Sequence, residues 1–555
     1  MTIRSLFLTT TFLLIGFTYC RAQSSPRYFI LFKDKANSPF SVSKPTDYLS
    51  ARSIARRTRQ KIQITENDFP VNPTYVTAIK QTGALAIFPS RWFNGLVVEA
   101  NASQLEAIKK LSFFKGIELN LPIANISSKS PGIERTATIS QKFETTEDID
   151  YGKMRDQLAL LGVEQLHQKG FHGENMLIAV FDNGFVKANE IDYFKPIFDE
   201  KRLLDTYNFL TRQSNVYASG DHGRAVLSII AAYKPGTLVG PAYKATFALY
   251  TTESEPIESP YEEVTWLMAA ERADSVGVDV INSSLGYYNF EGEFNTPGYN
   301  YPYSKMDGKT TIISRAARIA SRKGMIVVNA AGNEGTKPWH YLAAPADVDS
   351  VLSVGATDYL RNYASFSSWG PNAARQLKPD VAAVGAGTIV GNTAGTASSG
   401  SGTSFACPQI TGLAAILWQS YSNLTSQQII SVLKKSGHQA AKPDTLLGYG
   451  VPDVKRAEAI ILADYPILGT EKENLVSIVV SPNPVQDNLN IDFPANLVGQ
   501  KVDLSIILPN GAVLSQESVT VEKQVPLNVK SLDTGLYLLR INVKDQVRTL
   551  KILKQ

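Results

Sequence analysis

The sequence predicts an α/β protein: a mostly parallel sheet with helices on both faces, flanked by a small α+β module and a C-terminal β-sandwich. Two observations lead to this prediction. Between residues 148 and 463, short apolar runs alternate with segments of helical length, and such alternation is typical of parallel strands joined by crossover helices. From residue 476 to residue 555 the apolar runs become short and are separated by Pro, Asn and Gly, as in antiparallel sandwiches.

Composition places the chain among globular proteins. Of its 555 residues, 44% are hydrophobic and 19% are charged, and the formal net charge is +4. This length indicates several domains, and so small a charge does not favour a nucleic acid partner. A basic cluster is interpreted as a solvated helix face, because neutral residues interrupt it and no aromatic residues interleave it. The cluster comprises Arg52, Arg56, Arg57, Arg59 and Lys61.

Residues 1–22 are predicted to be a signal peptide. Arg4 supplies a positive start, Leu6 to Thr18 form an apolar stretch, and Cys20-Arg21-Ala22 has the small-x-small pattern of a cleavage site. The apolar stretch is too short to span a membrane stably. Removal of this segment would leave Cys407 as the one cysteine, which excludes a disulfide within the mature chain and predicts a buried packing residue.

The next segment, from residue 26 to about residue 122, predicts a small α+β module. Its expected strands cover residues 28–32, 84–88 and 95–100, and its expected helices cover residues 47–59 and 101–111. The second helix starts at a capping asparagine, Asn101. By pattern alone these elements fit any small α/β module. Residues 125–147, rich in Ser, Thr and charge, are predicted to be a linker.

Three residues of the central region suggest nucleophilic catalysis. Ser404 lies among small residues and opens an apolar run of helical length, so its hydroxyl would lie at the positive end of a helix dipole. A serine hydroxyl needs an adjacent base, and His222 is the best placed of the five histidines. Asp182 ends the apolar strand 176–181 and is the candidate carboxylate that orients the imidazole.

These residues lie in motifs that resemble the signatures of the subtilisin-like serine peptidases (subtilases, peptidase family S8). The motifs are Asp182-x-Gly184, His222-Gly223 and Gly402-Thr403-Ser404-x-Ala406. Their order, Asp then His then Ser, is the subtilisin order. The resemblance implies a subtilisin-like fold, with Ser404 as nucleophile, His222 as general base and Asp182 as its orienting carboxylate.

The resemblance extends to further site residues. Residues 326–335 resemble the strand and loop that carry the oxyanion-hole asparagine, which implies this role for Asn333. It also implies that the chain binds substrate through five residues that follow two strands, pairing with an extended peptide by β-addition. These residues are Ser284, Leu285, Gly286, Ala331 and Gly332.

With the family in view, the expected domains are a signal peptide (1–22), a propeptide with its linker (23–147), the subtilase catalytic domain (148–463), a linker (464–475) and a C-terminal β-sandwich (476–555). The propeptide is expected to act as folding template and inhibitor, and polypeptides are the expected substrates. No cofactor is expected to be required. A structural calcium is compatible with the family, although the sequence contains no Asp-x-Asp-x-Asp-Gly loop.

The C-terminal segment resembles the sorting domain of type IX secretion cargo. The motifs are Ser481–Pro484, Leu532–Tyr537 and the basic end Lys551–Lys554. The resemblance implies export through the periplasm and across the outer membrane, to the cell surface or the medium, with the type IX machinery as a partner. The alternative is a generic sugar- or protein-binding sandwich.

The predicted function is that of a secreted serine endopeptidase acting through an Asp-His-Ser triad and an acyl-enzyme. A dedicated processing protease with one protein substrate is an alternative that retains the same residues. A catalytically inactive surface adhesin of the same fold is another, and it is disfavoured because all four catalytic positions are occupied. Four neighbouring positions depart from the residues common in the family, which affects substrate preference and rate more than activity: Arg224, Val384, Phe405 and Gln409.

Overall fold

The structure is a computed structural model that describes residues 25–125, 149–253, 257–465, 478–508, 513–543 and 546–555. The predicted signal peptide and most of both predicted linkers lie outside these residues. The chain divides into two compact units, residues up to 460 and residues from 461. Within the described part of the chain, no helix has the length and apolarity needed to cross a membrane.

The N-terminal module is a four-stranded antiparallel sheet in the order β2-β3-β1-β4, with its own core around Ile30, Val98 and Ile108. The predicted capping asparagine is confirmed, because Asn101 Oδ1 accepts from Gln104 N at 3.0 Å. The predicted strands are also confirmed. The elements are β1 (Arg27–Phe32), α1 (Ala51–Arg59), α2 (Pro73–Gln81), β2 (Leu85–Ser90), β3 (Gly95–Glu99), α3 (Ala102–Lys109) and β4 (Phe114–Ile117).

The centre of the first unit is a seven-stranded sheet in the order β13-β12-β11-β10-β5-β9-β6, and every neighbouring pair is parallel. The predicted parallel sheet is therefore confirmed. Strands β5, β10, β11, β12 and β13 are buried along their whole length, as expected when helices cover both faces. The bounds are β5 (Leu177–Asp182), β6 (Leu203–Asn208), β9 (Thr246–Thr251), β10 (Val280–Ser283), β11 (Ile326–Ala330), β12 (Leu352–Thr357) and β13 (Val381–Val384).

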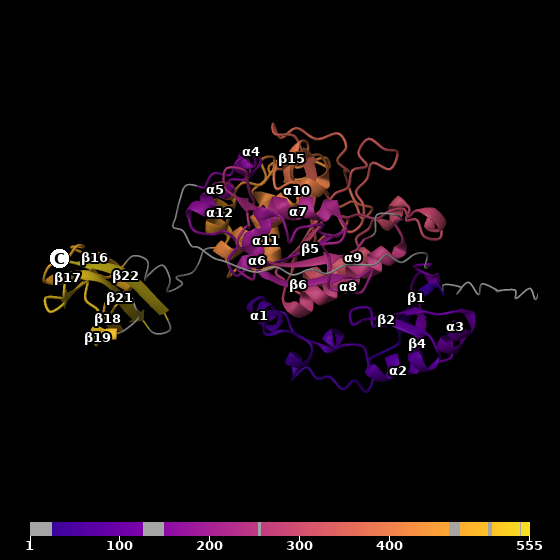
Figure 1. The fold of residues 1–555 in the computed structure, drawn as a ribbon, viewed down its shortest axis with the longest axis horizontal. Helices are drawn as coiled ribbons and strands as arrows, with labels where there is room; N and C mark the ends of the chain where they lie inside the picture. The colour runs from indigo at the N-terminus through magenta and orange to yellow at the C-terminus, as the bar shows by residue number, and fades with distance from the viewer. Residues whose placement is uncertain (1–24, 126–148, 254–256, 466–477, 509–512, 544–545) are drawn as a thin grey trace, which may run out of the picture. The chain divides into compact units, whose positions relative to one another are not determined.

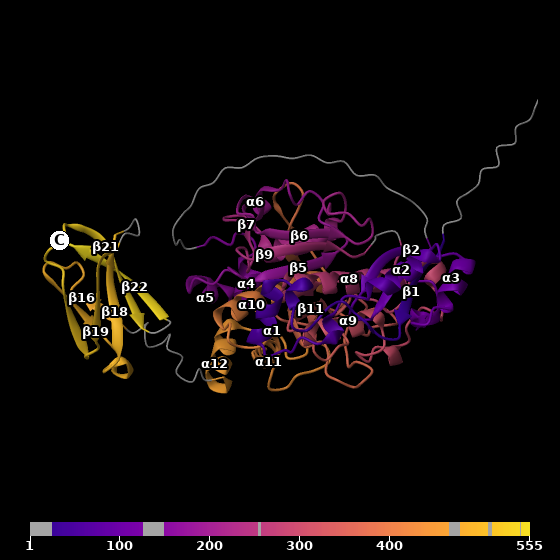
Figure 2. The same cartoon turned by 90° about the horizontal axis from the view of Figure 1, so that it is seen from below.

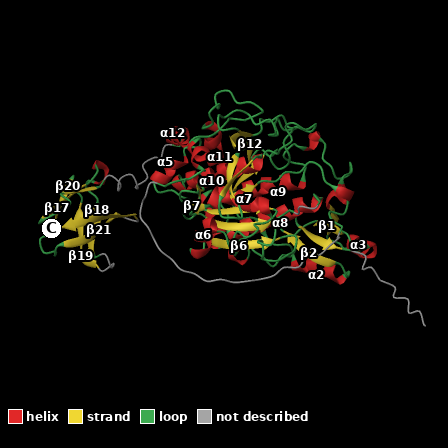
Figure 3. Ribbon diagram, turned by 45° about the horizontal axis from the view of Figure 1, so that its top comes forward, coloured by secondary structure: helices red, strands yellow, loops and turns green. Residues whose placement is uncertain are grey.

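Helices lie on both faces of this sheet (Figures 1 and 3). On one face, Ile281 of β10 belongs to the hydrophobic core that α8 and α9 complete. On the other face, the neighbouring Asn282 accepts from Thr411 Oγ1 of α10 at 2.7 Å. Successive residues of a strand point to opposite faces, so α10 lies opposite α8. The helices of this unit are α4 (Arg155–Ala159), α5 (Val163–Gln168), α6 (Lys195–Asp199), α7 (Asp221–Ala231), α8 (Pro260–Val276), α9 (Ile312–Arg322), α10 (Thr403–Ser420), α11 (Ser426–Lys435) and α12 (Val454–Asp464).

Two hairpins complete the first unit. They are β7 (Tyr233–Lys234) with β8 (Leu238–Val239), and β14 (Thr388–Gly391) with β15 (Ala397–Gly400). The second hairpin lies against α7, because Gly391 N donates to Ser228 Oγ of that helix at 2.7 Å. This contact helps to hold α7 in place along the sheet.

The N-terminal module packs against the α8 and α9 face (Figure 2). Phe29 and Val97 of its sheet belong to the same apolar core as Trp266 and Leu267 of α8. At the edge of this contact, the guanidinium of Arg27 lies 4.8 Å from the centre of the Tyr261 ring. Burial of apolar surface, at roughly 25 cal/mol per Å², therefore holds this module on α8 and α9.

The prediction that the basic cluster of α1 forms a solvated face is wrong for two of its members. Arg56 and Arg57 are only 2% and 1% exposed. Both donate to Asp274 of α8, and Arg57 also donates to Asp68 Oδ1 at 3.0 Å and Ser53 Oγ at 2.6 Å. A guanidinium is stable in such a position only when carboxylates compensate its lost hydration, and here α8 supplies the carboxylate.

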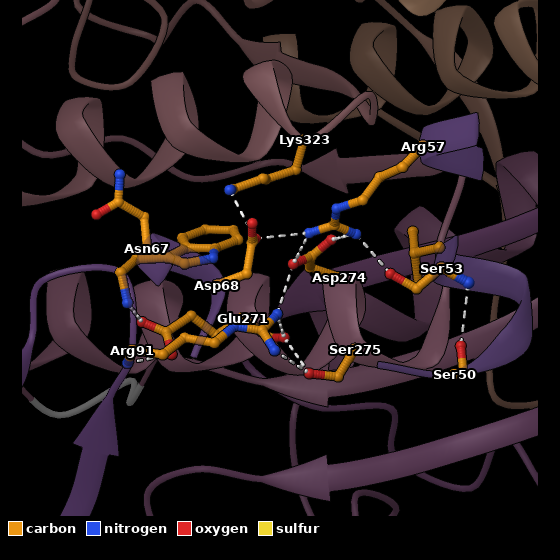
Figure 4. A network of polar contacts seen from close by, with 12 residues as sticks. Ser50, Ser53, Arg57, Asn67, Asp68, Arg91, Glu271, Asp274, Ser275 and Lys323 are labelled. Atoms are coloured by element: carbon orange, nitrogen blue, oxygen red, sulfur yellow. Dashed lines mark hydrogen bonds and ion pairs between the residues drawn. The ribbon is translucent and has the colours of Figure 1, made fainter. Parts of the chain in front are cut away.

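Figure 4 shows how this network continues across the contact between the module and α8. Arg91, between β2 and β3, also donates to Asp274, and its backbone N donates to Glu271 Oε2 at 2.9 Å. Lys323, just after α9, pairs with Asp68 at 2.6 Å. Burial of Asp274 opposes its charge, but the three surrounding arginines outweigh this effect and lower the pKa of its carboxyl to about 2. Asp274 therefore stays charged throughout the physiological range.

The second unit is a β-sandwich, as predicted. One sheet has the order β16-β17-β20 and the other the order β19-β18-β21-β22, and all their pairs are antiparallel. Leu489 and Ile491 from the first sheet and Leu504 and Leu539 from the second belong to one core. The strands are β16 (Val479–Ser481), β17 (Asn488–Asp492), β18 (Lys501–Ile507), β19 (Val513–Thr520), β20 (Gln524–Asn528), β21 (Gly535–Val543) and β22 (Gln546–Lys554).

Candidate active site

Asp182 is the last residue of β5 and is completely buried. One carboxylate oxygen, Oδ1, accepts from the backbone N of Asn183 at 2.9 Å and pairs with His222 Nδ1 at 2.8 Å. The other oxygen, Oδ2, is buried and has no hydrogen-bond donor among the described residues. The imidazole is therefore the principal side-chain partner of this carboxylate.

His222 is the second residue of α7, and its side chain is 31% exposed. Asp182 holds the ring at Nδ1, and the ring of Phe405 lies near it, with the two centres 5.6 Å apart. With Nδ1 occupied, Nε2 is the nitrogen left to exchange a proton with a substrate or nucleophile. The structure thus confirms the proximity of Asp182 and His222 that the motifs implied.

The charges around His222 favour its protonated form. Burial opposes a charge on the ring, but the carboxylate of Asp182, followed by those of Glu253 and Asp221, outweighs this effect and raises the pKa of His222 to about 9. An imidazole surrounded in this way is a strong base when neutral. The surrounding carboxylates also stabilise the imidazolium that forms when the ring accepts a proton.

The packing around position 223 explains why a glycine follows His222. A Cβ at this position would lie 2.3 Å from Gly184 O and 2.7 Å from Asp182 Cβ, which no packing tolerates. The first turn of α7 therefore lies directly on the end of β5 and on the loop after it. This close approach brings the imidazole within reach of Asp182.

Ser404 is the second residue of α10 and is 8% exposed. Its backbone O accepts from Ser284 Oγ at 3.0 Å, which ties the start of α10 to the segment after β10. The next residue, Phe405, lies against the ring of His222. The structure thus places Ser404 at the positive end of a long helix, beside the end of the sheet that carries Asp182.

Asn333 lies in the loop after β11. Its side-chain Oδ1 accepts from Thr403 N at 2.9 Å and from Thr403 Oγ1 at 3.1 Å, so the amide group is held against the start of α10. A Cβ placed on Gly402 would lie 3.0 Å from Ser404 Oγ and 3.7 Å from Asn333 Nδ2. The amide nitrogen and the hydroxyl therefore border the same small space beside Gly402.

The predicted substrate-binding residues follow β10 and β11, the two strands next to each other at this edge. Ser284 contacts Ser404 as described, and Leu285 O accepts from Asn329 Nδ2 at 3.0 Å. Gly332 N donates to Thr403 Oγ1 at 3.1 Å. Gly286 has no room for a side chain, because a Cβ would lie 2.9 Å from Ala343 Cβ. Ala331 N donates to Val354 O at 2.9 Å. Of these five residues, Ser284 and Gly332 contact the start of α10, at Ser404 and Thr403.

Sequence reasoning missed Glu253. Its carboxylate, the carboxylate of Asp182 and a ring nitrogen of His222 lie within 4.8 Å of one another, and among the described residues this is the one set of three potential metal-ligating side chains so close together. The available signal was positional: Glu253 follows β9, and residues after neighbouring parallel strands meet at one edge.

Two of the positions that depart from the family pattern link the helices of the site to neighbouring strands. Arg224 pairs with Asp221 and donates to the backbone O of Gly391, so it fastens α7 to β14. Gln409 Nε2 donates to Val384 O at 2.6 Å and to Phe405 O at 2.9 Å, which links α10 to β13. Cys407 is buried as predicted, and burial raises the pKa of its thiol to about 12.

Comparison with known protein families agrees with this geometry. The model of the subtilase family, peptidase S8, matches residues 173–450. The chain belongs to the subtilase family. A model of the Bacteroidota peptidase S8 propeptide domain matches residues 27–135, and a model of a secretion system C-terminal sorting domain matches residues 479–555. The expected propeptide and the expected C-terminal sorting domain are therefore both confirmed.

Several characterised subtilases are similar to this one. Subtilisin DY of Bacillus licheniformis is 26% identical over 274 residues, which are 49% of this chain and 87% of that protein. Subtilisin of Bacillus pumilus is 29% identical over 269 residues, 48% of this chain and 84% of that protein. The thermophilic serine proteinase of Bacillus sp. (strain AK1) is 30% identical over 269 residues, 47% of this chain and 56% of that protein.

The subtilase is thus a secreted serine endopeptidase. Its sorting domain directs it through type IX secretion to the cell surface or the extracellular space. The alternative of a generic C-terminal binding sandwich is not needed, because the sorting-domain model spans every strand of the sandwich, from β16 to β22.

Gly223→Ala is expected to damage the site without changing any polar group. The new methyl group would overlap Gly184 and Asp182, so α7 must shift and stretch the contact between His222 and Asp182. A displacement of about 1 Å can cost roughly a hundredfold in rate, and we expect kcat/KM to fall by about this factor in assays with a peptide substrate. Circular dichroism would show that the variant is folded, and wild-type kinetics would contradict the prediction.

Proposed function

We propose that this subtilase hydrolyses peptide bonds through a triad of Asp182, His222 and Ser404 and a covalent acyl-enzyme. The observation that carries the proposal is the 2.8 Å contact between Asp182 and His222 Nδ1. This contact sets the tautomer in which Nε2 is free to act as a base. Ser404 is the second residue of α10, and the ring of the next residue, Phe405, lies 5.6 Å from that of His222; this supports its role as the nucleophile.

In the first half of the reaction, Ser404 Oγ attacks the carbonyl carbon of the substrate while His222 Nε2 takes the hydroxyl proton. Asp182 stabilises the imidazolium that results. The negative charge on the carbonyl oxygen is stabilised by the side-chain amide of Asn333 and the backbone N–H of Ser404. When this intermediate collapses, the C–N bond breaks and His222 returns its proton to the leaving amine.

In the second half, a water molecule replaces the amine. His222 takes a proton from the water, the hydroxide attacks the acyl carbon, and the ester to Ser404 breaks with return of the proton to Oγ. Every proton is handled by the triad, so the proposed reaction requires no cofactor. Residues Ser284–Gly286 and Ala331–Gly332 are proposed to hold the peptide backbone in extended form beside Ser404, by β-addition.

We also propose that the propeptide domain inhibits the enzyme by binding to the face formed by α8 and α9. The arginines of the propeptide support this, because they compensate the charge of Asp274 of α8, which is buried in the contact with the propeptide (Figure 4). The contact combines an apolar core with charges that require both partners. Charge complementarity of this kind gives selectivity for one partner more than it gives raw affinity.

Ser404→Ala is expected to lower kcat/KM for a peptide substrate by at least about a thousandfold, because the residual rate would come from binding and oxyanion stabilisation alone. The precursor should also remain uncleaved when it is the sole protease present. Ser401→Ala is the matched control, since Ser401 lies three residues earlier on the exposed side of the same loop, and it should retain activity. A Ser404→Ala protein that digests casein at the wild-type rate would disprove the nucleophile.

Asn333→Ala is expected to lower kcat by roughly 100- to 1000-fold with little change in KM, because the amide donates mainly to the oxyanion of the transition state. Asn333→Asp separates this role from a structural one. The aspartate retains an acceptor for Thr403 N but loses the donor, so it should be about as slow as the alanine variant. A steady-state rate near wild type for Asn333→Asp would show that the residue acts through Thr403.

Arg57→Ala is expected to weaken inhibition by the propeptide added in trans. Breaking a buried ion pair on one side costs about 3–5 kcal/mol, so the inhibition constant should rise by at least roughly a hundredfold. Lys109→Ala is the control, because its pair with Glu106 is exposed and such pairs contribute little. Equal inhibition constants for the Arg57→Ala and wild-type propeptides, measured against the mature enzyme, would show that the ion network does not contribute to inhibition.

A further inference from the structure

Glu253 lies over the end of β5 although it belongs to the segment after β9. The two strands are parallel neighbours, and Asp182 is the register partner of Thr251. Beyond that pair, Thr252 N donates to Asp182 O at 3.0 Å, which carries the chain across the end of β5. Glu253 follows directly, and its carboxylate lies within 4.8 Å of both the Asp182 carboxylate and a ring nitrogen of His222.

Two carboxylates therefore flank a single imidazole. Asp182 uses Oδ1 for the ring, while its Oδ2 is buried without a donor among the described residues. The pair of carboxylates repel each other at this distance, and a positive charge between them relieves the repulsion. Among the described residues, the imidazole of His222 lies close to both carboxylates and can carry that charge.

Apart from Asp182 and Glu253, the groups that face His222 are uncharged or already have a partner of opposite charge. On its own helix, Asp221 is mostly exposed and pairs with Arg224, which is buried. From α10, the neighbour is the uncharged ring of Phe405. From β5 comes Asp182, and from the segment after β9 comes Glu253. Apart from Asp182, Glu253 is thus the carboxylate placed to act most directly on the ring.

We propose that Glu253 is a positioning residue of the peptidase reaction: its carboxylate, together with that of Asp182, stabilises the imidazolium that His222 forms during acyl transfer. This inference rests on the proposed triad. Glu253 would touch neither the substrate nor the reacting atoms, and it would act through His222. Its contribution would add a second negative charge to the single orienting carboxylate of the triad.

The direction in which Glu253 shifts the pH dependence of kcat/KM follows from its effect on the pKa of His222. In the free enzyme the neutral form of His222 is the base, so kcat/KM rises with pH through the pKa of this group. A carboxylate beside the ring favours the protonated form and moves this rise to higher pH, in agreement with a His222 pKa raised to about 9. Removing the charge of Glu253 should move the rise to lower pH. Because the imidazole would then be a weaker base, the rate on the alkaline plateau should fall as well.

The test is Glu253→Gln in the mature enzyme, with kcat/KM for a neutral peptide substrate measured against pH. We expect the acid limb to shift to lower pH by about one unit and the plateau to fall by roughly threefold. Glu253→Asp, which keeps the charge, should restore most of the wild-type limb. Asp221→Asn is the matched control, since it removes one carboxylate near His222 that Arg224 already compensates, and its shift should be clearly smaller.

A second readout does not depend on substrate binding. The rate at which phenylmethylsulfonyl fluoride inactivates the enzyme reports the nucleophilicity of the triad serine, and its pH profile should shift with that of kcat/KM. Titration with the same reagent counts folded active sites in each variant. These measurements keep a folding defect apart from an electrostatic effect.

Three results would overturn the inference. The acid limb of Glu253→Gln would coincide with that of the wild type, or Asp221→Asn would shift the limb equally. Alternatively, Glu253→Gln would raise KM only for peptides with Lys or Arg near the scissile bond and leave the limb unchanged, which would make Glu253 a substrate-contacting residue. If Ser404→Ala still abolishes activity in any of these cases, the triad stands and the role of Glu253 alone is rejected.

Discussion

The common direction of the seven central strands is the constraint on which the active site depends. Because β5, β9, β10 and β11 are parallel neighbours, the residues after them arrive at one edge of the sheet. Asp182, Glu253, Ser284 and Asn333 meet there although long stretches of chain separate them. Helix α10 starts at the same edge and places Ser404 among them. In α/β sheets ligands bind at this carboxyl edge, and here the candidate catalytic residues lie at the same edge.

A second constraint joins the propeptide to the catalytic domain. Asp274 is buried among three arginines of the propeptide, and charges of this kind are tolerated inside a protein only while all partners are present. Neither the arginines nor the carboxylate can be buried in charged form without the other. The contact is thus specific to the propeptide and the catalytic domain together.

Much of the architecture follows from local sequence. Fully apolar runs predicted the buried parallel strands, and short runs between Pro and Gly predicted the C-terminal sandwich. The pairing of Asp182 with His222 was also predictable, because Gly223 allows the first turn of α7 to lie on the end of β5. A motif of this type encodes a close approach of the backbone, and such an approach depends on only a few adjacent residues.

By itself, then, the sequence determined the order of domains, the strand-ending aspartate, the histidine with its glycine and the serine at a helix start, because each depends on residues within a few positions of it. Only the tertiary structure decided where the charges go. The local pattern predicted a solvated face for Arg56 and Arg57, and they are buried because α8 brings the carboxylate of Asp274 to them from more than 200 positions along the chain. No local pattern marks Glu253, and its carboxylate lies close to Asp182 and His222 because β9 pairs with β5. Electrostatic partners act through space, so a local pattern does not contain them.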